Sequence, residues 1–289
     1  MDAITRIERA LNAALDRAEG PGAPPRLAAA MRHAVFPRGA RIRPRLCLAV
    51  AAACGDDHPA VTDAAAAAIE LLHCASLVHD DLPCFDDAGT RRGRPSVHIA
   101  FGQALAVLAG DALIVAAFET LTVGTSRAPR RLPALARTIA RAVGMPGGIA
   151  AGQAWESEPS VDLAAYQRAK TGALFAAATV AGAAAAGVQP EPWHTLGERL
   201  GEAYQVADDI GDVLAGEAEL GKPIGRDSAL GRPNAALRYG VPGAMRHLEA
   251  LAAAAADSIP PCLGAAELRS LTLSEARRLL PKEMSLAAA

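Results

Sequence analysis

The stretch from Pro59 to Arg92 decides the fold, and it reads PAVTDAAAAAIELLHCASLVHDDLPCFDDAGTRR. After Pro59 there is no glycine or proline until Pro83. Apolar residues recur at the spacing of one helix face, at Val61, Ala65, Ile69 and Leu72. Because Pro59 suits the first turn of a helix and Pro83 cannot continue one, we expect a helix from Pro59 to Leu82, about 35 Å long.

An acidic cluster lies at the C-terminal end of this expected helix. Four carboxylates are followed by two cations, in the order Asp80, Asp81, Asp86, Asp87, Arg91 and Arg92. Unpaired backbone carbonyls give a helix C-terminus partial negative charge, so carboxylates placed there are unfavourable unless cations accompany them. The position of the cluster therefore predicts a bound metal ion.

A second acidic cluster, YQVADDIGD in residues 204–212, lies in a helix that we expect from Pro192 to Leu214. Gln205, Asp208 and Asp212 are three and four positions apart, so they share one helix face. Two acidic faces set in apolar sequence can oppose each other across a cavity. Ligands that are all oxygen atoms suit Mg²⁺, which keeps water molecules and completes its coordination with substrate phosphates.

The composition bounds the rest of the chain. Of its 289 residues 51% are hydrophobic, many of them alanine, and helical patterns recur without the alternation of β-strands. We therefore expect one all-α domain over residues 1–289. The formal net charge of −2 gives no indication of nucleic-acid binding. The five cysteines lack a metal-ligand spacing, which favours a reduced, cytoplasmic context.

The further helices that we expect run over residues 1–18, 26–35, 44–55, 99–123, 128–143, 163–186, 243–256 and 265–280. The N-terminus begins MDAITR, without a basic region followed by an apolar core, so we expect no signal peptide. The longest apolar run, residues 172–188, is nearly all alanine and glycine and is too weakly hydrophobic for a membrane span. We therefore expect no transmembrane segment.

A basic turn precedes the helix expected from Pro44. It carries three arginines close together, Arg38, Arg41 and Arg43. Free backbone N–H groups at the helix start point the same way, so the turn is either a phosphate-binding site or a solvated basic turn, and the pattern alone favours the second interpretation. His73 lies seven residues before Asp80, on nearly the same helix face, and a core histidine with one hydrogen bond is the ordinary interpretation of it.

The two acidic motifs resemble the first and second aspartate-rich motifs of the trans-polyprenyl diphosphate synthases. The first is D-D-x-x-x-x-D from Asp80, with two arginines behind it. The second is D-D-x-x-D from Asp208, preceded by Gln205 and followed by Lys222. The similarity runs over about residues 38–232, and within the family the sequence is most like bacterial geranylgeranyl diphosphate synthases.

This resemblance implies a single-domain isoprenoid synthase bundle of long helices around a central cavity, assembled as a homodimer. It also implies that the chain condenses allylic diphosphates (dimethylallyl, geranyl and farnesyl) with isopentenyl diphosphate. The reaction would be a Mg²⁺-assisted ionisation, condensation and elimination. The product would be geranylgeranyl diphosphate, and carotenoid biosynthesis would be one downstream use.

The resemblance further implies a role for each matching residue. The metal ligands would be Asp80, Asp81, Asp86, Asp208, Asp209 and Asp212. The residues that bind the allylic diphosphate would be Arg91, Lys170 and Lys222. The residues that bind isopentenyl diphosphate would be Arg41, Arg43, His73 and Arg92. The residues that act on the reacting allylic group would be Lys170, Thr171 and Gln205.

One departure from the family pattern matters. The family usually has a lysine where this chain has Ala40, so one expected contact to isopentenyl diphosphate is missing. Product length would be set just before Asp80, at Ala75 and Ser76. Farnesyl-type bacterial enzymes of the family carry an aromatic residue at the position of Ala75, so the small side chain here leaves room for a twenty-carbon product.

Several alternatives stay open at this point. A farnesyl diphosphate synthase would share the same motifs. A non-catalytic, regulatory subunit of a heteromeric prenyltransferase tends to lose aspartates, which are intact here, but Ala40 is compatible with it. A terpene cyclase of the same architecture has no use for a second diphosphate site. A metal phosphohydrolase of the His-Asp type, suggested by His79-Asp80, needs further histidine ligands that the spacing does not offer.

Overall fold

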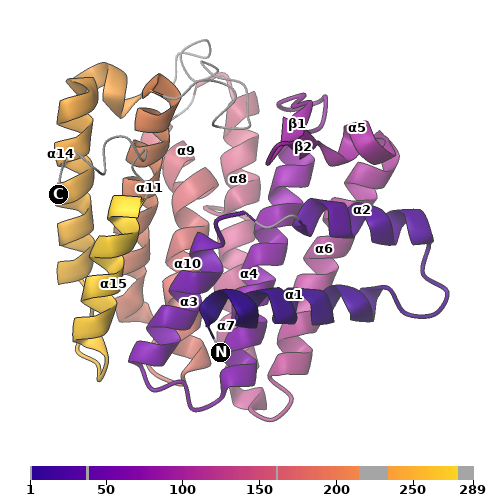
Figure 1. The fold of residues 1–289 in the computed structure, drawn as a ribbon, viewed down its shortest axis with the longest axis horizontal. Helices are drawn as coiled ribbons and strands as arrows, with labels where there is room; N and C mark the ends of the chain where they lie inside the picture. Colours follow the sequence, from indigo (N-terminus) through magenta and orange to yellow (C-terminus); the bar gives the residue numbers. More distant parts are fainter. Residues whose placement is uncertain (1, 37–38, 161, 215–233, 279–289) are drawn as a thin grey trace. The chain divides into compact units, whose positions relative to one another are not determined.

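Helices form most of the residues that the computed structural model describes, which are 2–36, 39–160, 162–214 and 234–278 (Figure 1). The helices are α1 (Ala3–Ala18), α2 (Pro25–Val35), α3 (Ile42–Ala53), α4 (Pro59–Asp80), α5 (Val97–Phe101), α6 (Gln103–Gly124), α7 (Leu132–Val143), α8 (Ile149–Ala154), α9 (Leu163–Gln167), α10 (Ala173–Ala185), α11 (His194–Leu214), α14 (Ala235–Asp257) and α15 (Ala265–Arg278). Within the described residues the only sheet is an antiparallel hairpin, β1 (Thr90–Arg91) with β2 (Arg94–Pro95). The predicted all-α fold class is confirmed.

The chain divides into two compact units. The first comprises Met1–Ala140 and Val180–Pro190, and the second comprises Arg141–Thr179 and Glu191–Ala289. The boundary between Thr179 and Val180 falls inside α10, so this helix contributes residues to both units. The expectation of a single domain stays a prediction.

In the first unit α4 is the central helix, packed against α6, α3 and α1. Its residues 64–69 are all buried, and five of these six are alanine. A side-chain carbon added at Gly124 of α6 would lie 2.2 Å from the Cβ atom of Ala64. Small residues thus allow the close packing of α4 and α6, which lie side by side in Figure 1. At the other side of α4, Arg6 of α1 donates to Asp63 at 2.8 Å.

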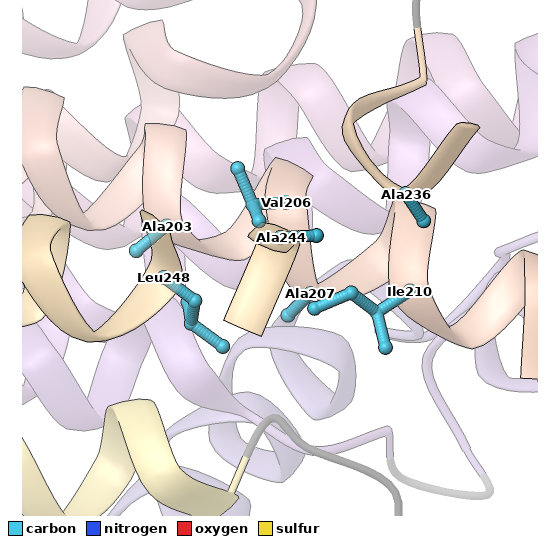
Figure 2. Packing of buried hydrophobic residues seen from close by; sticks show 7 residues of the cluster. All are labelled: Ala203, Val206, Ala207, Ile210, Ala236, Ala244 and Leu248. Atoms are coloured by element: carbon cyan, nitrogen blue, oxygen red, sulfur yellow. The ribbon is translucent and has the colours of Figure 1, made fainter. Parts of the chain in front are cut away.

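In the second unit α11 packs against α14 and α15. Figure 2 shows the core that α11 and α14 share, which consists of Ala203, Val206, Ala207, Ile210, Ala236, Ala244 and Leu248. α14 begins at Ala235, ahead of the start predicted at residue 243, and it is kinked at Gly240 (φ 67°), two residues before Pro242. This core fixes the C-terminal half of α11, which carries the second acidic motif.

The structure differs from the expected elements at three further places. α4 ends at Asp80, two residues before its predicted end, because the chain turns back there. The helix expected over residues 99–123 is broken into α5 and α6 at Gly102, whose φ of 89° no helix accommodates. The helix expected over residues 163–186 contains a π-helical turn at Arg168–Gly172, where the hydrogen bonding loosens locally. The hairpin was too short for a strand pattern to indicate it.

Two helices, α4 and α6, are long and apolar enough to cross a membrane by length and composition alone. Most of α4 is buried within its own unit, as is normal for a core helix. α6 exposes several apolar side chains, namely Val107, Leu108, Val115 and Val123. The expectation of no transmembrane segment therefore stays a prediction.

Candidate active site

The first acidic motif lies in a turn that follows α4. The backbone N–H of Asp86 donates to the carbonyl of Asp80 at 2.9 Å, and the N–H of Ala88 donates to the carbonyl of Asp81 at 3.1 Å. The turn thus satisfies carbonyls that a helix end leaves without partners. It also brings Asp86 back to Asp80, although six positions separate them, and both side chains are half-buried.

Asp81 is held by Arg91 of β1. The Asp81 side chain is 2% exposed, and Arg91 Nε donates to its two carboxylate oxygens at 3.0 and 3.3 Å. Arg91 Nη2 also donates to Oδ1. Burial raises the pKa of Asp81, and the Arg91 guanidinium opposes that rise. The pair therefore fixes the hairpin to the end of α4, and it leaves Asp80 and Asp86 as the more exposed of the three predicted metal ligands.

Three of the four predicted contacts to isopentenyl diphosphate lie along one part of α4. Arg43 Nη1 lies 3.5 Å from His73 Nε2, and Arg92 Nη1 lies 4.0 Å from the sulfur of Cys74, the next residue on the helix. Burial lowers the pKa of His73 well below its usual value, and the surrounding arginines lower it further. Near neutral pH, His73 is therefore a neutral hydrogen-bonding group among cations.

The fourth predicted contact, Arg41, is a structural residue instead. Its side chain is fully buried. Its Nε donates to Glu8 at 3.0 Å, its Nη1 to Glu70 at 2.7 Å, and its Nη2 to the carbonyl of Val35 at 2.9 Å. Since every nitrogen of the guanidinium already donates inside the protein, we withdraw Arg41 as a diphosphate contact. Sequence reasoning missed Glu70, although it is the one charged residue in the apolar run 64–72.

The aspartates of the second motif divide between two roles. Asp208 and Asp212 are half-buried on α11, on the face that their spacing predicted. Asp209 is buried, and its Oδ2 accepts from the N–H of Ala235, the first residue of α14, at 2.7 Å. Its Oδ1 accepts from Gln205 Nε2 at 3.1 Å. Asp209 therefore ties α11 to the start of α14, and its role as a metal ligand stays a prediction.

The structure brings Thr171 and Gln205 together. The hydroxyl of Thr171 donates to Gln205 Oε1 at 3.2 Å. Thr171 belongs to the π-helical turn Arg168–Gly172, and such turns are frequent at functional sites. A chain of hydrogen bonds therefore runs from Thr171 through Gln205 to Asp209.

Lys170 pairs with a carboxylate that sequence reasoning missed. Its Nζ lies 2.6 Å from Glu156 Oε1, to which the Tyr166 hydroxyl also donates at 2.7 Å. Gln153 Nε2 donates to the other oxygen of Glu156 at 2.8 Å. A side-chain carbon on Gly152 would lie 2.5 Å from the backbone nitrogen of Lys170, so α8 packs directly against this segment. The position of Glu156, about one helical turn after Gln153, is the signal that could have found it.

The remaining predicted residues differ in how far the structure describes them. Lys222, the third predicted contact to the allylic diphosphate, lies outside the described residues. Ala75 is buried on α4, and the hydroxyl of its neighbour Ser76 donates to the carbonyl of His73 at 2.8 Å. Ala75 is therefore part of a packed interior, where the size of a side chain decides the space available.

The acidic residues fit Mg²⁺ by the chemistry of their donor atoms. Among the residues that the structure describes, no group of three or more His, Cys, Asp and Glu side chains forms a complete metal site. Each motif instead offers two half-buried carboxylates, Asp80 with Asp86 and Asp208 with Asp212. Partial sets of oxygen ligands suit Mg²⁺, because it keeps several waters and takes further ligands from phosphates.

Long helices that carry two aspartate motifs, with arginines and a half-buried histidine beside the first, are the features of an isoprenoid synthase. The sequence model of the polyprenyl synthetase family matches residues 24–256. The chain belongs to this family.

Its relatives include proteins of the same length. The chain is 54% identical over 280 residues to the geranylgeranyl diphosphate synthase of Cereibacter sphaeroides, which is 97% of each chain. It is also 54% identical over 275 residues to the geranylgeranyl diphosphate synthase of Rhodobacter capsulatus, which is 95% of each chain. The crystal structure of a geranyltransferase from Helicobacter pylori, complexed with magnesium and isoprenyl diphosphate, matches with a TM-score of 0.78 and 27% identity over 96% of this chain and 98% of that one.

Separate replacement of two adjacent aspartates tests the division of roles in the second motif. Asp209→Ala leaves the N–H groups of Ala235 and Gln205 without their acceptor, so we expect it to lower the free energy of unfolding by about 1–3 kcal/mol. Asp208→Ala keeps the acceptor of both of these N–H groups, so it should lower the free energy of unfolding by less than Asp209→Ala does. Urea denaturation without metal, followed by circular dichroism, measures both, and an equal loss in the two variants would contradict the structural role of Asp209.

Proposed function

We propose that the chain is a geranylgeranyl diphosphate synthase, which lengthens allylic diphosphates by addition of isopentenyl diphosphate. One observation carries the proposal: both aspartate motifs are intact in a chain that is 54% identical, over nearly its whole length, to two synthases of that name. The allylic substrates are dimethylallyl, geranyl and farnesyl diphosphate.

Each acidic motif supplies metal ligands for the allylic diphosphate, as the family resemblance implies. Asp80 and Asp86 in the first motif, and Asp208 and Asp212 in the second, supply oxygen ligands for Mg²⁺. When bound, Mg²⁺ neutralises charge on the leaving diphosphate and so favours its departure. Asp81 acts indirectly, because its ion pair with Arg91 fixes the turn that brings Asp86 to Asp80.

Three residues of the second unit, Lys170, Thr171 and Gln205, act on the allylic substrate in this proposal. Lys170 contacts the diphosphate, and the carboxylate of Glu156 holds its ammonium group in place at 2.6 Å. The oxygen atoms of Thr171 and Gln205 direct their dipoles at the cation that forms when the diphosphate departs. Because Thr171 donates its proton to Gln205, its own lone pairs are available for this role.

Isopentenyl diphosphate binds in the first unit. Arg43 and Arg92 bind its diphosphate by charge-assisted hydrogen bonds, and neutral His73 adds a hydrogen bond without adding charge. The double bond of isopentenyl diphosphate attacks the allylic carbon, and loss of a proton from the new cation completes each addition. The departing diphosphate takes this proton.

The exposed side of α6 supports a homodimer as the working form. Val107, Leu108, Val115 and Val123 are all exposed on this helix, and apolar side chains gathered in this way mark a contact surface. A second copy of the chain covers them in our proposal. The five cysteines are all free thiols, which supports a cytoplasmic location. The boundary between the two units falls inside the continuous helix α10, which supports a single domain.

One observation favours a second candidate, a non-catalytic subunit of a heteromeric prenyltransferase. Ala40 stands where the family usually has a lysine that binds isopentenyl diphosphate, and it is exposed in the structure. Such a subunit would bind allylic diphosphate without elongating it.

Incorporation of radiolabelled isopentenyl diphosphate by the purified chain tests the proposed function. With Mg²⁺ and dimethylallyl, geranyl or farnesyl diphosphate offered separately, we expect geranylgeraniol from all three after dephosphorylation and chromatography. Asp208→Ala is the matched control, and its rate should fall by at least about a hundredfold, since it removes a ligand of the leaving-group metal. No incorporation by the folded wild-type chain from any primer would favour the non-catalytic subunit.

An aromatic side chain at Ala75 should shorten the product. Ala75 is buried on α4, and a phenyl ring there fills space that the growing chain would otherwise use. We expect Ala75→Phe to release mainly farnesyl diphosphate, whereas Ala75→Ser, which stays small, should still release geranylgeranyl diphosphate. Chromatography of the dephosphorylated alcohols measures both. A folded, active Ala75→Phe variant that still makes the twenty-carbon product would contradict the role of this position.

A further inference from the structure

Two arginines whose backbones lie in the left-handed region converge on one buried carboxylate. Arg41 has a φ of 51° and Arg92 a φ of 54°. The Oε1 atom of Glu70 lies 2.7 Å from Arg41 Nη1 and 3.8 Å from Arg92 Nη2. Positive φ is unfavourable for a residue with a side chain, and it persists only where the surroundings over-determine it. The backbone conformation of Arg41 thus points to a function for the place where the two side chains meet.

The position of Arg92 follows from the hairpin. Arg92 and Gly93 are the two residues between β1 and β2, and both have positive φ, as the tight turns of hairpins require. The turn directs the guanidinium of Arg92 toward the basic turn, where a side-chain carbon added at Gly39 would lie 2.8 Å from its Cζ atom. Arg92 therefore packs against backbone at Gly39 and faces Glu70 and Cys74 on α4.

Glu70 lies directly behind the proposed contacts to isopentenyl diphosphate. It is 2% exposed, and His73 and Cys74 follow it by three and four positions, so all three share one face of α4. Arg92, whose side chain is 21% exposed, reaches from Glu70 toward solvent on this face. The Glu70 carboxylate can orient Arg92 but is itself too deeply buried to contact a ligand.

We infer that Glu70 is a positioning residue for isopentenyl diphosphate, which holds the guanidinium of Arg92 in the orientation that binds the diphosphate. This inference rests on the proposed function and deepens it. Glu70 touches neither substrate, so it acts only through Arg92.

Arg41 explains how the carboxylate of Glu70 can lie next to a site that binds an anion. An unpaired carboxylate near a diphosphate would repel it, but Arg41 is fully buried and closer to Glu70 than Arg92 is, so it neutralises the charge of Glu70. Arg92 then keeps its positive charge for the ligand. The missing lysine at Ala40 makes the site depend more on Arg92, and hence on the residue that orients it.

Two isosteric substitutions separate positioning from stability. Glu70→Gln and Glu8→Gln each remove one anionic partner of Arg41, but only the first removes the carboxylate beside Arg92. We expect Glu70→Gln to raise KM for isopentenyl diphosphate about tenfold, as loss of one charge-assisted contact does. KM for geranyl diphosphate and kcat should stay within about twofold, and Glu8→Gln should leave all three parameters within about twofold.

A third variant tests whether binding depends on the orientation of Arg92, and it does so even if Glu70→Gln does not fold. Gly39→Ala places a methyl group where the Arg92 guanidinium lies and leaves the Arg41 pair with Glu70 untouched. Because the displaced group is the end of a flexible side chain, the variant should fold and show the same selective rise in KM for isopentenyl diphosphate.

The outcomes separate this inference from the function on which it rests. A folded wild-type chain that incorporates no isopentenyl diphosphate overturns the proposed function. If the wild type is active but KM for isopentenyl diphosphate falls or stays unchanged in folded Glu70→Gln, only the positioning role of Glu70 is overturned. The positioning role is also overturned if KM for isopentenyl diphosphate rises equally in Glu70→Gln and Glu8→Gln. If Glu70→Gln does not fold, an unchanged KM for isopentenyl diphosphate in Gly39→Ala overturns it.

Discussion

Charges buried on α4 must be paired, and this requirement organises the first unit. Glu70 and Asp81 are both almost fully buried on or next to this helix, and each is paired with an arginine from another segment. Removal of one partner from a buried ion pair typically costs about 3–5 kcal/mol, because the other charge is left uncompensated. Arg41 thereby fixes the start of α3, and Arg91 fixes the hairpin. These ion pairs therefore keep the segments that carry Arg43 and Arg92 close to His73. The proposed diphosphate contacts are thus preorganised before a ligand binds.

The second unit uses hydrogen bonds among neutral and charged groups for the same purpose. Thr171 donates to Gln205, Gln205 donates to Asp209, and Asp209 accepts from the first N–H of α14. Each dipole in this series of hydrogen bonds is oriented by the next, so little reorganisation is needed when charge develops on the substrate. The π-helical turn at Arg168–Gly172 is the local irregularity that presents Thr171 to Gln205.

Sequence patterns predicted the helices, the fold class and the two acidic motifs, because helical periodicity and helix-terminating prolines are local signals. They did not predict which aspartate of each motif is buried. Asp209 follows Asp208 directly, and only the packing of α14 on α11 shows that it serves as a structural acceptor. The roles of Glu70 and Glu156 were missed for the same reason, since the partners of each come from segments far apart in the sequence or from an irregular turn. The motif pattern predicts that Arg41 contacts isopentenyl diphosphate, because a motif reflects neighbours along the sequence and not the burial of a side chain.

The function proposed above requires Mg²⁺ ligands from each of the two acidic motifs for tight binding of the allylic diphosphate. Calorimetric titration with an unreactive analogue of geranyl diphosphate, in which sulfur replaces the bridging oxygen, tests this claim most directly. We expect binding in the presence of Mg²⁺ and an affinity at least about a hundredfold weaker after chelation of the metal. We expect a similar loss of affinity in Asp80→Ala and in Asp208→Ala with Mg²⁺ present. Equal affinity with and without Mg²⁺ would contradict this claim.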